Sequence, residues 1–207
     1  MKGVTVIHHP LVQDALTRLR DGETGLAEFR RVLGQAGVML VYEATRSLNL
    51  KSARVKTPLG PARGVRLKDE IVLVPVLRAG LGMLQSVLEL LPEARVGFIG
   101  VSRDEETLEA RRYHASLVRD LHRCEIVLID PMLATGGSAV AALDLIRERG
   151  GHRVRMVNLV AAPEGLARVR RHHPRVPIFV AAIDRRLNRK GYIVPGLGDA
   201  GDRLFGI

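Results

Sequence analysis

The chain has 207 residues, of which 46% are hydrophobic and only 3% aromatic, so it suits an α/β domain with an aliphatic core. The formal net charge is +10, from 32 basic and 22 acidic residues, and arginine dominates because lysine occurs only five times. The single cysteine, Cys124, excludes an internal disulfide and a zinc site built from several cysteines. No apolar run has the length of a membrane span or a signal-peptide core, so we expect a cytoplasmic protein with no membrane partner.

The basic balance predicts polyanionic ligands, which include phosphorylated metabolites and nucleic acid. The arginines are spread along the chain, and no aromatic residues interleave with them for base stacking. We therefore expect small phosphorylated ligands and no nucleic-acid partner.

Hydrophobic periodicity predicts a strand at 4–7, then helices at 10–20 and 25–45. Residues 51–68 contain several prolines and glycines and are expected to form a loop or an irregular hairpin. From residue 70 onward, strands are expected at 71–77, 96–101, 126–130, 154–160 and 178–183, and helices at 81–91, 139–149 and 164–172. This alternation predicts an α/β fold, with a central parallel sheet and helices on both faces. We expect residues 1–207 to form a single domain.

A long polar segment, 102–125, separates two of the predicted core strands. Such an excursion is typical of a functional lid or a protruding arm, and a solvated helix or hairpin is the alternative. Its root, Ser102 and Arg103, follows a strand, as do Arg78 and Asp130. Because ligands of such sheets bind beyond the carboxyl ends of the strands, we expect these side chains to lie together.

The segment 126–138 predicts a phosphate-binding corner. An apolar run ends in Asp130, a loop of small residues with two glycines follows, and an alanine-rich helical pattern begins. Free backbone N–H groups and the positive end of a helix dipole converge at such a corner, and Thr135 and Ser138 can add hydroxyl donors. Asp130 would repel a phosphate and is better placed for sugar hydroxyls or a metal ion. No lysine lies near the loop, which excludes a Walker A motif, and an ordinary strand-to-helix connection is the alternative.

This loop and two further segments together resemble the uracil phosphoribosyltransferases. The segments are Pro75–Gly82 and the tail 188–203, of which Gly191–Asp202 resembles the uracil-specific enzymes. The opening residues 9–12 and 16–21 also resemble this family, so the resemblance covers nearly the full chain. The wider phosphoribosyltransferase class often has two adjacent acids at the start of its loop. Here the second is Pro131, which leaves Asp130 as the single acid for the ribose.

The resemblance implies a type I phosphoribosyltransferase fold with N-terminal helices and a protruding arm. It implies a pentosyltransferase of pyrimidine salvage that converts uracil and 5-phosphoribosyl 1-diphosphate (PRPP) to UMP and diphosphate. Mg²⁺ would bind mainly through the diphosphate of PRPP, without a dedicated protein site. A homodimer or homotetramer and an allosteric GTP effector are also implied.

The resemblance also assigns site residues. Arg78 would bind the diphosphate through its planar fork, and Arg103 would close over the same leaving group. The residues expected to bind PRPP are Arg78, Arg103, Asp130, Pro131, Met132, Leu133, Ala134, Thr135, Gly136, Gly137, Ser138 and Asp199. The residues expected to bind uracil are Ile193, Gly198, Asp199 and Ala200. The catalytic assignments are Arg78, Arg103, Asp130 and Asp199, with a mainly electrostatic role.

The edge of uracil presents an acceptor, a donor and an acceptor, which backbone groups of the tail can complement without a charged residue. Cytosine would create two buried mismatches, each costing about 1–3 kcal/mol. Two alternatives stay open. One is an RNA-binding pyrimidine regulator on the same fold. The other is a transferase for a purine or for orotate, whose carboxylate could pair with Arg203 or Lys190.

Overall fold

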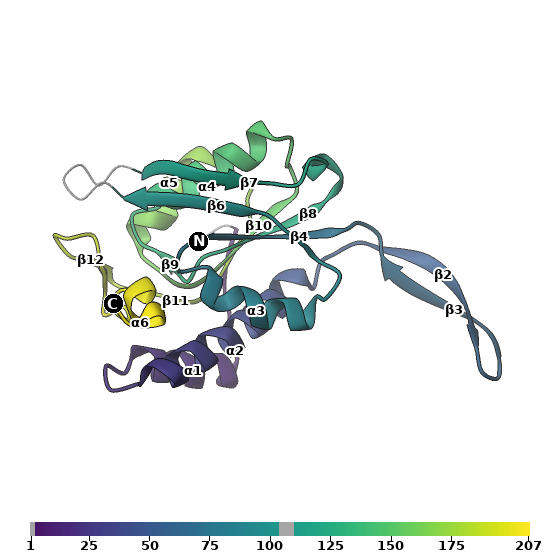
Figure 1. Ribbon diagram of the computed structural model, residues 1–207, viewed down its shortest axis with the longest axis horizontal. Coiled ribbons are helices and arrows are strands. Elements are labelled where there is room, and N and C mark those ends of the chain that lie inside the picture. Colours follow the sequence, from purple (N-terminus) through teal and green to yellow (C-terminus); the bar gives the residue numbers. More distant parts are fainter. Residues whose placement is uncertain (1–2, 104–109) are drawn as a thin grey trace.

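The structure, a computed structural model, describes residues 3–103 and 110–207, and the side chains of 102, 103 and 110–112 lie outside this description (Figure 1). The helices are α1 Pro10–Arg20, α2 Leu26–Thr45, α3 Leu81–Leu90, α4 Gly137–Glu148, α5 Pro163–His172 and α6 Ala200–Phe205, with a 3-10 turn η1 at Leu121–Arg123. The strands are β1 Val4–Val6, β2 Leu50–Thr57, β3 Gly60–Leu67, β4 Ile71–Leu77, β5 Arg95–Val96, β6 Phe98–Arg103, β7 Ala110–Ser116, β8 Glu125–Ile129, β9 Met132–Leu133, β10 Val154–Ala161, β11 Ile178–Ile183, β12 Arg186–Leu187 and β13 Ile193–Val194.

The central sheet has the strand order β1-β11-β10-β8-β4-β6-β7. Every neighbouring pair along this path is parallel except β6 and β7, which are antiparallel. The central strand β4, and β8 after its first residue Glu125, are continuous apolar runs because both of their faces are covered. The predicted α/β class with a mainly parallel sheet is therefore confirmed.

Helices cover both faces of the sheet, as Figure 1 shows. Leu73 packs into one core layer with residues of α1, α2, α3 and α6, including the fully buried Phe29 and Met83. Its neighbour Val74 points the other way, into a second layer with α4 and α5 that includes Ile146. This alternation follows the two-residue period of a strand, so one strand supplies both cores.

The arm that projects from the body is the hairpin β2–β3, at the right of Figure 1. A loop or an irregular hairpin was expected here. The hairpin is instead regular, because an unbroken register runs from Leu50↔Leu67 to Thr57↔Gly60. The prolines and glycines that suggested irregularity lie at the turn and in a two-stranded ribbon. Both strands of such a ribbon are edge strands, in which proline is tolerated although it has no N–H to donate. Thr57 closes the turn, since its Oγ1 donates to the carbonyl of Gly60 at 2.8 Å.

The polar segment 102–125 is described only in part, because residues 104–109 lie outside the described residues. Its described part contains β7, which pairs with β6 at the sheet edge, and η1, which leads into β8. The strand expected at 96–101 is divided into β5 and β6 at Gly97. Gly97 donates its N–H to the carbonyl of Leu73 at 2.9 Å, and a Cβ there would lie 2.8 Å from the side chain of Leu117. A side chain at position 97 would therefore require the Leu117 side chain to move.

Candidate active site

A cavity of about 880 Å³ opens at the carboxyl ends of β4 and β8. Its lining brings together segments that are far apart in the sequence: the end of β4, the loop before α4 and the tail after β12. The predicted site residues that line it are Arg78, Asp130, Met132, Leu133, Ala134, Thr135, Gly136, Ser138, Ile193, Gly198, Asp199 and Ala200. The cavity therefore contains both the predicted phosphate loop, residues 130–138, and the predicted base segment, residues 193–200.

Three predicted site residues are not among the lining residues. Pro131 and Gly137 are buried, and the carbonyl of Pro131 is tied to β10 by the N–H of Leu159 at 2.9 Å. Arg103 ends β6, and its side chain lies outside the described part of the chain. The roles expected for these three residues stay predictions.

Further residues line the cavity that the sequence analysis did not select. Arg189, Lys190 and Tyr192 follow β12 and belong to the tail 188–203 that carries the resemblance, and of these three only Lys190 was considered, as a partner for orotate. Tyr113 enters from β7, which reaches the cavity only because it pairs with β6. No local sequence pattern could place Tyr113 there, because its position depends on that pairing.

The phosphate loop has the geometry of an anion-binding helix start. Gly136 is the N-cap of α4 in the left-handed conformation, with φ +77°, which favours glycine. The first turn of α4 therefore presents backbone N–H groups toward the loop, beside Ser138. At the start of the loop, the Oδ1 atom of Asp130 accepts from the N–H of Met132 at 3.3 Å. Its carbonyl accepts from Nδ2 of the buried Asn158 at 2.7 Å, so β10 holds the loop entrance.

A second glycine lets α5 support this loop from behind. A Cβ on Gly165 would lie 2.3 Å from the carbonyl oxygen of Ala134, and one on Gly136 would lie 2.8 Å from the carbonyl oxygen of Gly165. The backbones of loop and helix are thus in direct contact. Gly165 belongs to no motif that the sequence analysis used, because its neighbour lies 31 positions earlier in the chain.

Arg78 stands exposed at the end of β4, after a cis Leu77–Arg78 peptide bond. Its Cζ atom lies 6.0 Å from the ring centroid of Phe205. Among the described residues it has no ion-pair partner, so a structural salt bridge does not explain its position. A Cβ on Gly80 would lie 2.6 Å from the carbonyl oxygen of Ile129, so the chain after Arg78 packs directly against the end of β8.

The base segment is held by an ion pair behind it. Arg20, the last residue of α1, binds the carboxylate of Asp184 through Nη1 at 2.8 Å and Nη2 at 2.6 Å. The same Nη1 donates to the carbonyl of Gly196 at 2.8 Å, and the N–H of Gly196 donates to Oδ2 of Asp184 at 2.8 Å. The N–H and the carbonyl of Gly196 are thus both fixed by charged side chains.

Arg203 makes a second tie between α1 and the base segment. Its Nη1 donates to the carbonyls of Leu19 and Leu197, the latter at 2.9 Å, and its Nη2 donates to the carbonyl of Asp21 at 2.6 Å. Its guanidinium lies 4.3 Å from the ring centroid of Phe29, and burial lowers its pKa. Arg203 does not line the cavity, which removes it as a partner for the carboxylate of orotate.

Asp199 combines a structural contact with a place on the cavity wall. Its Oδ1 atom accepts from the N–H groups of Gly201 at 2.8 Å and Asp202 at 3.0 Å, which makes Asp199 the N-cap of α6. The cap orients the carboxylate at the cavity edge. The preceding turn contains Gly198 with φ +79°, a conformation that favours glycine.

Comparison with known proteins agrees with this arrangement. A profile of the family described as uracil phosphoribosyltransferase matches residues 6–207. The chain belongs to the uracil phosphoribosyltransferase family. Proteins of that name from Symbiobacterium thermophilum and Shouchella clausii are 51% and 49% identical over 207 residues, which is 100% of this chain and 99% of each relative.

Solved structures share the fold of this chain. A protein from Aquifex aeolicus superposes with a TM-score of 0.94 at 43% identity, covering 99% of this chain and 98% of that one. An adenine phosphoribosyl transferase from Trypanosoma brucei has a TM-score of 0.61 at 12% identity, covering 88% and 84% of the two chains. The second likeness shows the fold alone, and it confirms the predicted type I phosphoribosyltransferase architecture of this family member.

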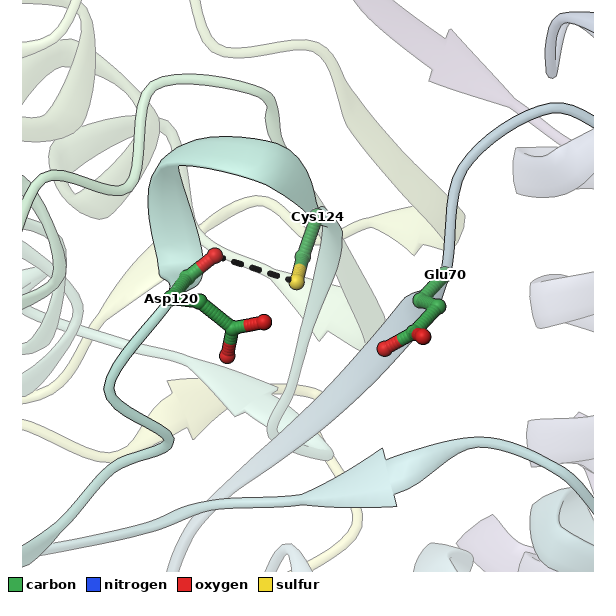
Figure 2. A group of neighbouring side chains, drawn as sticks. All are labelled: Glu70, Asp120 and Cys124. Atoms are coloured by element: carbon green, nitrogen blue, oxygen red, sulfur yellow. Dashed lines mark hydrogen bonds between the residues drawn. The ribbon is translucent and has the colours of Figure 1, made fainter.

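Outside the cavity, this uracil phosphoribosyltransferase family member has a group of metal-ligating side chains. The side-chain ligand atoms of Glu70, Asp120 and Cys124 lie within 4.8 Å of one another. Figure 2 shows these three side chains. The guanidinium of Arg95 binds all three groups, with Nη2 2.9 Å from Glu70 and 3.1 Å from the sulfur of Cys124 and Nη1 2.9 Å from Asp120. A cation of the protein itself therefore lies among the three groups and offsets one of the two carboxylate charges.

The environment of this cluster shifts two pKa values in opposite directions. The hydrogen bonds from Arg95 lower the pKa of Asp120. Burial raises the pKa of the Cys124 thiol, whose sulfur contacts the carbonyl of Asp120 at 3.4 Å (Figure 2). The Cys124 side chain is buried, since it is 1% exposed.

Proposed function

We propose that this chain is a uracil phosphoribosyltransferase of pyrimidine salvage. It joins N1 of uracil to C1′ of PRPP, while the bond from C1′ to the diphosphate breaks and the N1 proton is released. The products are UMP and diphosphate. The observation that carries the proposal is the single cavity in which the phosphate loop before α4 faces the base segment around Ile193 and Gly198.

The phosphate loop would hold the ribose 5-phosphate. Support comes from the left-handed Gly136, which opens the backbone toward the cavity, and from the hydroxyls of Thr135 and Ser138 on its wall. Asp130, at the start of the loop, would accept hydrogen bonds from the ribose hydroxyls. Its negative charge would also stabilise the cationic character that develops at C1′ when the diphosphate leaves.

Arg78 would bind the diphosphate and stabilise the charge that builds up on it. Its support is an exposed guanidinium on the cavity wall, backed by the ring of Phe205. Arg103 would close over the same group from the end of β6. A planar guanidinium can donate two parallel bonds to a phosphate, which suits this role.

Mg²⁺ fits this cavity as an ion that travels with PRPP. Asp130 and Asp199 supply carboxylate oxygens on the cavity wall, which are ligands that Mg²⁺ accepts directly or through its waters. The ion would neutralise part of the diphosphate charge. The phosphate loop and Arg78 would orient PRPP in the cavity.

Uracil would be recognised by backbone groups of the base segment, from Ile193 to Ala200. These groups are suited to the role because Arg20, Asp184 and Arg203 fix the loop between them. A rigid set of donors and acceptors penalises a base with the wrong pattern. Cytosine should therefore be a poor substrate.

The alternatives are less well supported. A regulator that binds only RNA has no need of a base segment tied to α1 by two arginines. Lys190 and Arg203 were the two residues considered as partners for the carboxylate of orotate. An orotate-specific enzyme would have to use Lys190, because Arg203 does not line the cavity and binds the carbonyl of Leu197 instead.

The proposal extends to assembly, regulation and location. A homodimer or homotetramer is supported by the projecting hairpin β2–β3, whose Leu59 and Val65 are 100% and 62% exposed. Activation by GTP is carried over from the family resemblance. A cytoplasmic location is compatible with the described helices, none of which is both long and apolar enough to cross a membrane.

The direct test is formation of UMP from uracil and PRPP, measured with and without Mg²⁺. We expect UMP and diphosphate in equal amounts, strong dependence on Mg²⁺, and little product from cytosine, orotate or adenine. Absence of UMP, or a faster reaction with another base, would refute the proposal. A gel-shift titration with pyrimidine-operon leader RNA at physiological salt tests the RNA-binding alternative.

A further inference from the structure

A second cavity, of about 700 Å³, lies at the opposite edge of the sheet from the candidate active site. It opens beside the amino ends of β10 and β11, because the lining residues His152 and Val176 each lie two positions before the start of those strands. Apolar side chains, including Leu143 and Val154, form one part of its wall, and arginines and histidines form the rest. Among the described residues, no aspartate or glutamate lines it.

The charge of this second cavity is uncompensated. Arg147, Arg171 and Arg175 are exposed on its wall, and none of their guanidinium groups has an ion-pair or hydrogen-bond partner in the described part of the chain. Arg155, on neighbouring β10, is different, because its Nη2 lies 2.7 Å from Oε2 of Glu125. These three arginines thus lie together where the surface is concave, and a concave basic site raises the local concentration of anions.

Neighbouring groups do not cancel this charge. Asp144, next to the lining residue Leu143, is engaged by the buried His173, with Nε2 3.0 Å from Oδ1. The helices α4 and α5 both end near the cavity, and each helix end carries a partial charge of about −0.5. Asp144 adds one negative charge to these two helix ends, and the three full positive charges of the arginines exceed that total by about one.

We propose that this second cavity binds a phosphorylated small molecule. Its phosphates would contact Arg147, Arg171 and Arg175, whose planar forks match phosphate oxygens, and its remaining part would lie on Leu143 and Val154. The volume falls within the range of about 300–1,000 Å³ that is usual for small-ligand sites.

Two helices connect this site to the candidate active site. The first residues of α4 follow the phosphate loop, and Arg147 near its end lines the second cavity. In α5, Gly165 contacts the same loop through Ala134, and Arg171 lines the second cavity. We expect occupancy of the second cavity to change the affinity for PRPP. This coupling rests on the proposed function, whereas the binding does not.

Calorimetric titration tests the binding. Inorganic triphosphate, ATP and GTP are titrated, with Mg²⁺ in excess, into the unmodified chain, into R171Q/R175Q and into a control, R54Q/R63Q, that removes the same charge from the hairpin β2–β3. Each titration is repeated with the additional change Arg78→Gln, so that binding at the candidate active site does not hide the second event.

We expect R171Q/R175Q to weaken binding of the triphosphate group by about tenfold or more, and the control to stay within about twofold of the unmodified chain. An unchanged affinity in R171Q/R175Q, or equal weakening in the control, would overturn the proposal. Tighter binding of ATP or GTP than of inorganic triphosphate supports contact with the apolar wall, and equal affinities would contradict that contact.

Steady-state kinetics tests the coupling. A triphosphate-induced change in the KM for PRPP that occurs in the unmodified chain and in R54Q/R63Q, but not in R171Q/R175Q, supports it. The same change in all three proteins would assign the effect to the active site and overturn the coupling. A chain that forms no UMP at all would refute the proposed function and leave the calorimetric result standing.

Discussion

Arg20 and Asp184, which are 164 positions apart, form a two-bond ion pair that fixes the backbone of the base segment. Asp184 is 7% exposed, and the pair holds both the N–H and the carbonyl of Gly196. The N-terminal helix α1 therefore stabilises the loop that we propose recognises uracil. Removing one partner leaves a buried charge, which typically costs about 3–5 kcal/mol.

The change Asp184→Asn should raise the KM for uracil by about tenfold, or about 1.4 kcal/mol, because the loop loses its charged anchor. The KM for PRPP should change by less than about twofold, because the phosphate loop has separate supports. Thermal denaturation should show a lower free energy of unfolding as well. Steady-state kinetics with each substrate varied in turn gives both values.

A matched control separates this effect from the general loss of an ion pair. Glu43→Gln removes the carboxylate that Arg46 binds at 2.7 Å on the exposed surface of α2. Exposed pairs contribute about 0–1 kcal/mol, so neither KM should change. Equal increases in the KM values for uracil and PRPP in Asp184→Asn would contradict a specific role in base recognition.

Gly165→Ala should weaken PRPP binding. Alanine normally stabilises a helix relative to glycine by about 1 kcal/mol, but here the added Cβ would lie 2.3 Å from the carbonyl oxygen of Ala134. The phosphate loop must shift, so we expect a KM for PRPP raised by about tenfold and a stability loss of about 1–3 kcal/mol. In the control Gly22→Ala, nothing lies within 4 Å of the new Cβ, and the kinetics should be unchanged. An unaltered KM for PRPP in Gly165→Ala would show that the loop does not depend on this contact.

Arg78→Ala and Asp130→Asn should each reduce kcat/KM by about 100-fold or more, because each removes charge stabilisation from the transition state. Arg78 is exposed, so its replacement should change stability by no more than about 0.5 kcal/mol. Rates measured beside melting curves distinguish lost chemistry from lost folding. Full activity in either variant would refute the assigned role of that residue.

Cys124 should resist alkylation in the native protein. Burial raises the pKa of its thiol, so the reactive thiolate is scarce near neutral pH, and the side chain is 1% exposed. Modification by iodoacetamide should be at least about 100-fold slower than in the unfolded chain. Mass spectrometry of timed samples measures both rates, and native labelling at the unfolded rate would mean that the cluster around Arg95 opens freely.

Local patterns in the sequence predicted the sheet and its helices because each element has a clear hydrophobic period. The strand expected at 71–77 is β4, and the helix expected at 10–20 is α1. The hairpin β2–β3 was expected to be irregular because its prolines and glycines suggest broken structure, yet they sit where no hydrogen bond is lost.

The candidate site was predictable where neighbours in the sequence are also neighbours in space. The loop around Thr135 and the tail around Gly198 are of this kind. The roles of Arg20, Asp184 and Gly165 depend on contacts between distant segments, so no local spacing indicates them. Family resemblance covered the segment that contains Arg20 but assigned it no function.

The central claim is that the loop before α4 binds the 5′-phosphate while the base segment binds the pyrimidine. A crystal structure with UMP tests it most directly. The account predicts the phosphate within hydrogen-bond distance of the backbone between Thr135 and Ser138, with the uracil ring against backbone groups of Ile193 and Gly198. A nucleotide bound elsewhere, or bound in the reverse orientation within the same cavity, would contradict it.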